Sequence, residues 1–189
     1  IVFKFIPSTD TLIASLQAGD VGMVTQDALD VNYASVLDKL DGIKPYYIPG
    51  TTWEHIDFNI QPVDTIINSG AFSGWVAAGS TDGPFGDVRL REAIIQCIDR
   101  QALVDTALYG QSIVIDTYLP PNAPLFATDA KHWPYDPTAA QALLDEIGWK
   151  DTDNDPATPR VAVGVAGVPD NTPLAFAYES TNSALRTQV

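Results

Sequence analysis

The sequence predicts an α/β (α+β) domain with a mixed sheet and flanking helices. Short apolar segments of strand type alternate with segments whose apolar residues recur at helical spacing. This alternation is typical of helices packed against a sheet. A hydrophobic content of 46% and a mean hydropathy of +0.02 predict a folded chain. With 189 residues, one domain is the default organisation, so residues 1–189 are expected to form a single domain.

The elements are expected in this order along the chain. Strands are predicted at about 2–6, 20–24, 43–49 and 52–59, extended segments near 112–118, and further strands near 160–166 and 173–179. Helices are predicted at about 10–18, 27–40 and 137–147, with two in series over 88–109 and the start of another after Thr181 or Asn182. Prolines predict a rigid, extended connection over 119–136.

The predicted helix pair carries the clearest local signals. Asp87 lies where an N-cap is expected, and its carboxylate would accept free backbone N–H groups of the first turn. Asp99 is a second expected cap, and Gly110 is expected to end the second helix. Cys97, the single cysteine, falls on the apolar stripe of the first helix, so we expect a buried and unreactive thiol.

Charge and motif content exclude several classes of function. The formal net charge of −14 disfavours nucleic acid and anionic membrane surfaces as partners. No apolar run approaches the roughly 18 residues that span a bilayer. His55 and His132, the only histidines, are far apart in sequence, and the chain contains no nucleophile elbow, P-loop or dinucleotide-binding glycine motif. We therefore expect no enzyme activity, and His55 is interpreted as a sheet residue on the same face as Trp53 and Asp57.

One acidic segment has the spacing of a metal loop. Asp151, Asp153 and Asp155 form a D-x-D-x-D pattern like the opening of a calcium loop. Such loops then require Gly and a late bidentate Glu, whereas Pro156 follows here and no acid precedes Arg160. A solvated acidic turn is the favoured interpretation, and calcium is the alternative. No other cofactor is expected.

Several aromatic residues could stack on a sugar or a peptide. Trp and Tyr offer a large contact area with few rotamers to freeze, which suits a ligand cleft. Trp53 and Trp75 stay open as ligand contacts. Trp149 follows the expected helix stop at Gly148 and is interpreted as a packing residue, and Trp133 as a loop anchor.

Five motifs resemble those of the family 5 extracellular solute-binding proteins, which are the peptide, nickel and oligosaccharide receptors of ABC importers. The most informative is "P-F-x-D-x-R-x-R-x-A" followed by "I-D-R" and a Gly, over 84–110. The others resemble "I-P-D-x-x-T…A-L-x-x-G-E-V-D", "W-x-x-L-x-F-N", "Y-D-P-x-x-A-x-x-L-L-x-E-A-G-W" and "Y-x-x-S-N-x-x-R", at 1–21, 53–59, 135–149 and 178–186. All five occur in the family's order.

The resemblance implies a lobe of a type II periplasmic-binding-protein-like fold, truncated from the C-terminal-side lobe of a two-lobed protein. The implied function is the capture of a peptide or other small solute between two lobes and its delivery to the membrane subunits of an ABC permease. The implied location is extracellular or periplasmic, with a lipoprotein anchor in the full-length protein, and a monomer is expected. Residues 60–86 are expected to be an insertion relative to the family.

The resemblance also places the ligand pocket. The turn after the last predicted strand lines the pocket in this family, which makes Tyr178, Glu179, Ser180, Thr181 and Asn182 the candidates in this chain. Thr181 or Asn182 is also expected to cap the next helix. Two alternatives from other classes stay open: a ligand-sensing domain of a receptor, and a calcium-dependent surface domain.

Overall fold

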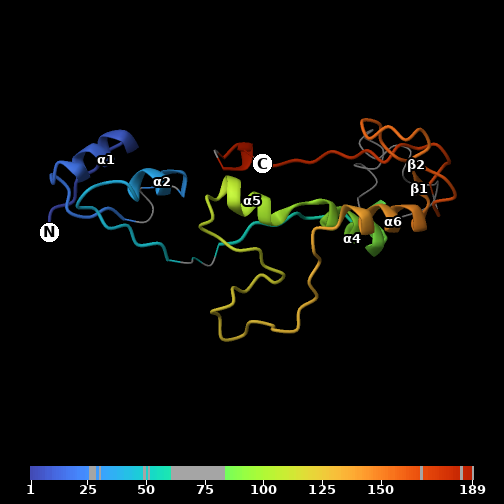
Figure 1. Ribbon diagram of the computed structural model, residues 1–189, viewed down its shortest axis with the longest axis horizontal. Coiled ribbons are helices and arrows are strands. Elements are labelled where there is room, and N and C mark those ends of the chain that lie inside the picture. The colour runs from blue at the N-terminus through green and yellow to red at the C-terminus, as the bar shows by residue number, and fades with distance from the viewer. Residues whose placement is uncertain are drawn as a thin grey trace. The chain divides into compact units, whose positions relative to one another are not determined.

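The computed structural model describes residues 1–25, 29, 31–48, 50, 52–60, 84–166, 168–183 and 185–188. The chain divides into two compact units (Figure 1). The first comprises Ile1–Thr52, Arg100–Ile115 and Ser183–Val189, and the second comprises Trp53–Asp99 and Asp116–Asn182. The assignment of all residues to one lobe stays a prediction. Most of the expected insertion over 60–86, including Trp75, lies outside the described residues.

The first unit is built from short helices. Helix α1 (Thr9–Gln17) begins after Ser8, whose hydroxyl accepts the N–H of Thr11 at 3.5 Å, and it buries Leu12 and Ile13. The turn η2 (Val31–Tyr33) leads into α2 (Ala34–Leu37), so only this part of the helix expected over 27–40 is helical among the described residues. Helix α5 (Arg100–Ala107) buries Val104 and Ala107.

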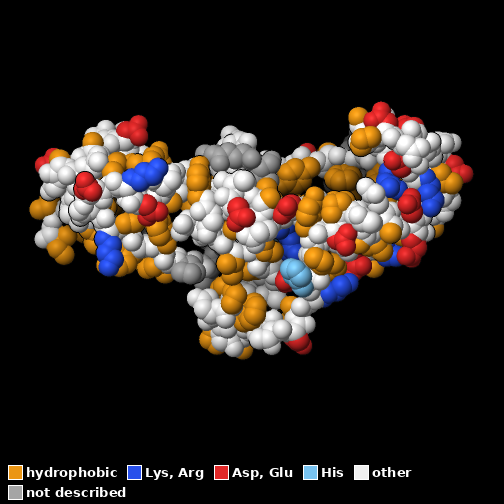
Figure 2. All heavy atoms as spheres, viewed as in Figure 1, with side chains coloured by type: hydrophobic (Ala, Val, Ile, Leu, Met, Phe, Trp, Pro, Cys, Tyr) orange, Lys and Arg blue, Asp and Glu red, His pale blue; other side chains and the backbone are white. Residues whose placement is uncertain are grey.

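The C-terminal end of the first unit differs in one detail from the prediction. The element there is a single 3-10 turn, η4 (Arg186–Gln188). The hydroxyl of Ser183 accepts the N–H of Arg186 at 3.3 Å. Ser183 therefore caps this turn at Arg186, and the cap expected from Thr181 or Asn182 stays a prediction. Figure 2 shows hydrophobic side chains at the surface over α1 and α2, next to acidic and basic ones.

The second unit contains the larger core. It consists of η3 (Pro84–Gly86), α4 (Val88–Cys97), α6 (Pro137–Ile147), β1 (Trp149–Lys150) and β2 (Val161–Ala162). Helix α4 packs on α6, and β1 pairs antiparallel with β2 in the register Trp149 to Ala162 and Lys150 to Val161. The fully buried alanines on the two helices permit close approach of their backbones. The core residues are Phe85, Leu90, Ala93, Ala140, Leu144, Ile147, Trp149 and Ala162.

Helix α6 confirms its predicted bounds because its ends carry strong local signals. The Asp136 carboxylate accepts the N–H of Ala139 at 2.9 Å, and Pro137 occupies the first turn, where it sacrifices no hydrogen bond. Gly148 ends the helix in the left-handed conformation at φ 100°. Trp149, the next residue, is 1% exposed, which confirms its packing role at the helix end.

The sheet is smaller than the sequence predicts. Among the described residues, no strand forms at 2–6, 20–24, 43–49, 52–59 or 112–118, and the two C-terminal segments contribute only β2 and a single bridge between Val161 and Pro173. A strand needs a hydrogen-bonded neighbour, whereas β-propensity measures only how well side chains fit a pleated surface. Segment 1–6 illustrates this, because Ile1, Val2, Phe3 and Phe5 are all largely exposed.

Cys97 corrects a second expectation. It is exposed rather than buried, because it is the last residue of α4 and the buried positions of that helix are Leu90 and Ala93. Partial desolvation still raises the pKa of its thiol, which favours the unreactive protonated form. Within the described part of the chain, we find no helix with the length and apolar character that crossing a bilayer requires.

Candidate functional site

The predicted pocket residues follow a segment that is fixed to the core. The N–H of Leu174 donates to the carbonyl of Arg160 at 2.7 Å, and the ring of Phe176 packs edge-on against Phe85, with the centroids 5.2 Å apart. Beyond this point the chain is exposed, with Tyr178 at 64%, and the other candidates, Glu179, Ser180, Thr181 and Asn182, are exposed as well. All five candidates therefore lie on one exposed segment, and the residues just before it are attached to the core.

Phe85 also holds the segment that contains Trp53. The ring of Phe58 lies against Phe85 with the centroids 5.3 Å apart, so Phe85 contacts both Phe58 and Phe176. Phe85 is 5% exposed and belongs to the core. One buried ring thus supports both segments that carry described ligand candidates.

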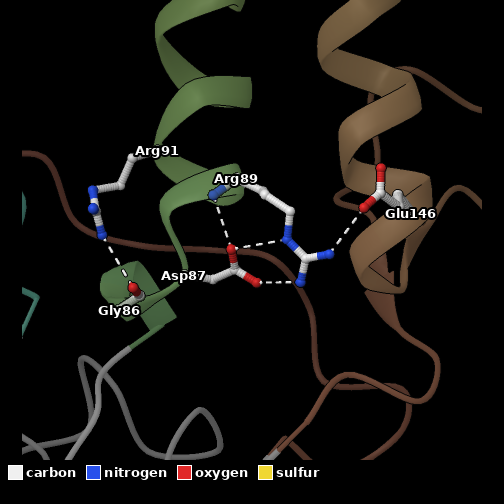
Figure 3. A network of polar contacts seen from close by, with 5 residues as sticks. All are labelled: Gly86, Asp87, Arg89, Arg91 and Glu146. Atoms are coloured by element: carbon white, nitrogen blue, oxygen red, sulfur yellow. Dashed lines mark hydrogen bonds and ion pairs between the residues drawn. The ribbon is translucent and has the colours of Figure 1, made fainter.

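The turn that carries Phe85 is fixed by arginines of α4 (Figure 3). Arg91 donates to the carbonyls of Phe85 and Gly86, the latter at 3.2 Å. The Arg89 guanidinium donates to both carboxylate oxygens of Asp87, at 3.1 and 2.7 Å, and to Glu146 of α6 at 3.0 Å. Asp87 caps α4 as predicted, because its Oδ1 accepts the N–H of Arg89 at 2.8 Å.

This arrangement has a clear electrostatic effect. The hydrogen bond from Arg89, outweighing the opposing effect of partial burial, lowers the pKa of Asp87. Hydrogen bonds to Asp87 and then to Glu146 raise the pKa of Arg89, so both partners stay charged at neutral pH. The "P-F-x-D-x-R-x-R" motif therefore fixes the turn that carries the supporting ring of Phe85.

A second group of candidates lies on the segment from Trp53 to Asp57. The rings of Trp53 and His55 are in contact, with centroids 4.3 Å apart and planes tilted by 40°, and the Nε2–H of His55 donates to Asp57 at 2.9 Å. This confirms that the three side chains share one face. The ring of Tyr118 approaches Trp53 to 6.1 Å between centroids, and Nδ1–H of His132 donates to Asp116 at 2.7 Å.

The acidic segment after Lys150 forms a series of turns. Carboxylates of Asp151, Asp153 and Asp155 accept the N–H groups of Asn154, Asp155 and Ala157, at 2.7, 3.0 and 2.9 Å. The N–H of Asp155 and then the hydroxyl of Thr158 lower the pKa of Asp153. No group of three His, Cys, Asp or Glu suited to a metal ion occurs among the described residues. The solvated acidic turn therefore stays the favoured interpretation, and calcium binding by this loop stays an untested alternative.

Trp133 lies in the connection that follows α5. The Lys131 ammonium lies 4.8 Å from the centre of its ring and pairs with Glu92 of α4. The N–H of Asp136 donates to the carbonyl of Gln96 at 2.9 Å, so the connection is held against α4 at this point. These contacts agree with the predicted anchoring role of Trp133.

Three relationships at this site were missed by sequence reasoning. They are the contact of Phe85 with Phe176, the approach of Tyr118 to Trp53 and the ion pair of Arg89 with Glu146. Each joins segments far apart in the chain, and no periodic pattern encodes such a pairing. The one available signal was the conspicuous Phe within the "P-F-x-D" motif, which is apolar in a segment otherwise made of turn residues.

The comparisons with known proteins agree with the described fold. Residues 1–188 match the family described as bacterial extracellular solute-binding proteins, family 5, middle part. The nickel-binding periplasmic protein of Escherichia coli K12 is 26% identical over 152 residues, which cover 79% of this chain and 25% of the relative. The glutathione-binding protein of the same strain is 28% identical over 151 residues, with 79% and 25% covered.

Two solved structures resemble this chain. The oligopeptide-binding protein of Thermus thermophilus, complexed with a pentapeptide, has a TM-score of 0.52 and 25% identity, over 86% of this chain and 25% of that one. NikA from Brucella suis in complex with Fe(III)-EDTA also has a TM-score of 0.52, at 20% identity, over 87% and 28%. The chain spans about a quarter of the length of its relatives.

These findings confirm the predicted α/β lobe of the periplasmic-binding-protein type, since helices and a small sheet match those structures. They also agree with the expectation of a binding protein, because the matched family consists of solute-binding proteins rather than enzymes. The match extends over nearly the whole sequence, and the chain belongs to the family 5 bacterial extracellular solute-binding proteins.

Proposed function

We propose that this chain is part of the substrate-capture component of an ABC importer. In this function the protein binds a peptide or another small solute between two lobes and delivers it to the membrane subunits of the permease. The observation that carries the proposal is the family match over residues 1–188. Relatives whose names state glutathione, nickel and oligopeptide binding support a small, polar solute.

The mechanism follows from ligand-driven closure. A solute that contacts both lobes binds the closed form more tightly than the open form, and it shifts the population by that difference in affinity. A shift from 1:99 to 99:1 requires a preference of about 5.5 kcal/mol for the closed form. The closed form is then the one that docks on the permease.

The proposed ligand contacts are Tyr178, Glu179, Ser180, Thr181, Asn182, Trp53 and Trp75. Support for those that the structure describes comes from two properties, exposure of the side chains and attachment of their segments to Phe85. A rigid support limits the conformational entropy that the segments lose when a solute binds. Trp75 rests on the sequence alone.

We further propose an extracellular or periplasmic location, with a lipid anchor on the full-length protein, and a monomeric state. A secretion signal with a lipid-attachment cysteine in the parent sequence would favour transport. A transmembrane segment joined to a signalling domain would instead favour a ligand-sensing receptor. The parent sequence therefore separates these two functions directly.

The test uses the full-length protein that contains these residues. Mass spectrometry of small molecules released on denaturation should identify a copurifying solute, and calorimetry should then give its affinity. Tyr178→Ala should weaken binding at least fivefold, whereas Tyr46→Ala, at a tyrosine of similar exposure (74% against 64%), should leave it unchanged. Absence of any copurified solute, together with no binding of peptides or metal chelates, would refute the proposal.

A further inference from the structure

One surface of the second unit combines aromatic rings with carboxylates. We call it the aromatic–acidic surface, and it consists of Trp53, His55, Asp57, Asp116 and Tyr118. Trp53 contacts the rings of both His55 and Tyr118, at centroid distances of 4.3 and 6.1 Å. His55 holds Asp57 at 2.9 Å, and His132 holds Asp116 at 2.7 Å. The ring of His55 thus fixes the carboxylate of Asp57 relative to Trp53.

The surface is accessible and carries negative charge. Trp53 is 40% and Tyr118 69% exposed, and the side chain of Asp57 is 89% exposed. No Lys or Arg occurs in residues 52–60 or 111–130, the two segments that form it. Lys131, one residue beyond the second segment, already pairs with Glu92 and lies over the ring of Trp133. Arg100 donates to the carbonyl of Ile115 at 3.3 Å, next to Asp116 in the sequence, so Asp57 is the carboxylate considered for a ligand.

These properties restrict what can cover the surface. A neutral, apolar ligand would remove water from the carboxylate of Asp57. This carboxylate accepts a hydrogen bond from His55 and has the capacity to accept several more. Such desolvation of a charged group is strongly unfavourable. A ligand that brings a positive charge offsets this cost, and its cation is also attracted to the faces of the Trp and Tyr rings.

We propose that the aromatic–acidic surface binds the guanidinium group of an arginine side chain in a peptide solute. The planar fork of guanidinium can stack on Trp53 or Tyr118 while its N–H groups donate to the exposed carboxylate of Asp57. This inference rests on the proposed function and adds a preference for cationic peptides to it.

The experiment compares three probes on the full-length protein by calorimetry: Ala-Arg-Ala, Ala-Leu-Ala and arginine amide. We expect Ala-Arg-Ala to bind about threefold to tenfold more tightly than Ala-Leu-Ala, as an exposed cation–π contact with an added ionic hydrogen bond implies. Trp53→Leu and Asp57→Asn should each reduce this ratio toward one. Tyr46→Leu, at an exposed aromatic residue of the first unit that lies 5.0 Å from the Lys44 ammonium, is the matched control and should leave the ratio unchanged.

The outcomes separate the two proposals. If both tripeptides bind equally, or if the ratio survives Trp53→Leu, the arginine site is refuted while peptide capture stands. If arginine amide binds in a Trp53-dependent manner but neither tripeptide binds, cation recognition stands and peptide capture is refuted. If no probe binds, the arginine site is refuted, and the copurification experiment alone then decides whether the protein captures another solute. Circular dichroism of each variant shows that a lost preference is not lost folding.

Discussion

The guanidinium of Arg89 and the carboxylate of Glu146 lie 3.0 Å apart and join the first turn of α4 to the last turn of α6. The same guanidinium holds Asp87, the cap of α4, through two further hydrogen bonds. The helix cap and the link between the helices therefore share one side chain. This arrangement fixes η3, and with it Phe85, at the place where the two candidate ligand segments attach.

The charge on Asp87 should stabilise the fold in a pH-dependent manner. Its pKa is lowered from 3.8, mainly by the hydrogen bond from Arg89. A carboxyl with a lower pKa in the folded chain contributes stability above its ordinary pKa and loses it as the pH falls through the lowered value. Asp87→Asn, which keeps the cap but removes the charge, should therefore lower stability at pH 7 and make progressively less difference below about pH 4.

Urea denaturation of wild type and variant between pH 7 and pH 3 measures this effect. The matched control is Asp129→Asn, because Asp129 is exposed and has no hydrogen-bond partner among the described residues. A difference between wild type and Asp87→Asn that is the same at both ends of the pH range would contradict the prediction.

Gly148 should not tolerate a side chain. Its φ is 100°, and a Cβ atom there would lie 2.7 Å from the carbonyl oxygen of Val163, which belongs to the backbone and cannot turn aside. We expect Gly148→Ala to cost well over 1 kcal/mol, since the left-handed conformation alone costs about 1–2 kcal/mol for a residue with a Cβ. Gly110→Ala, at φ 70° with nothing within 4 Å, should show the conformational cost alone. If thermal unfolding shows equal losses of stability in Gly148→Ala and Gly110→Ala, the clash with the Val163 carbonyl contributes nothing.

Phe85→Leu should affect both stability and solute binding. The change keeps an apolar side chain but removes two ring contacts, with Phe58 and Phe176, each worth about 0.5–1.5 kcal/mol. We expect a loss of roughly 1–3 kcal/mol in chemical denaturation and weaker solute binding by the full-length protein. Phe5→Leu is the control, because Phe5 is 96% exposed. Unchanged affinity in a destabilised Phe85→Leu protein would show that the ring does not position the ligand segments.

The acidic loop from Asp151 to Thr158 should behave as a turn rather than a calcium site. Its carboxylates already accept N–H groups of the loop itself, and the hydroxyl of Thr158 donates to Asp153 at 2.9 Å. We expect the same melting temperature in millimolar calcium and in millimolar magnesium, with Asp153→Ala lowering it equally in both. A calcium-specific rise that disappears in Asp153→Ala would instead establish the calcium loop.

Local signals in the sequence were sufficient to predict some elements. Helix α6 was predicted to the residue, because Asp136, Pro137 and Gly148 each act on their own immediate backbone. The shared face of Trp53 and His55 was also predictable, because side chains two residues apart in extended chain point the same way.

Pairings between distant segments were not predictable in this way. Most of the expected strands have suitable composition but find no hydrogen-bonded neighbour among the described residues. No periodic pattern in the sequence predicts that Tyr118 lies near Trp53 or that Phe176 packs on Phe85. Cys97 shows a related error, because its helical spacing predicted burial, whereas it is the last residue of α4 and is exposed.

The double contact of Phe85 has a consequence for how related proteins diverge. Because Phe58 and Phe176 touch the same ring from two segments, a bulkier residue at one position leaves less room for the other. Positions 58, 85 and 176 should therefore covary among relatives, with total ring volume nearly constant. Redesign of specificity at Trp53 and at Tyr178 would have to proceed jointly, because adjusting one segment displaces the ring on which the other rests.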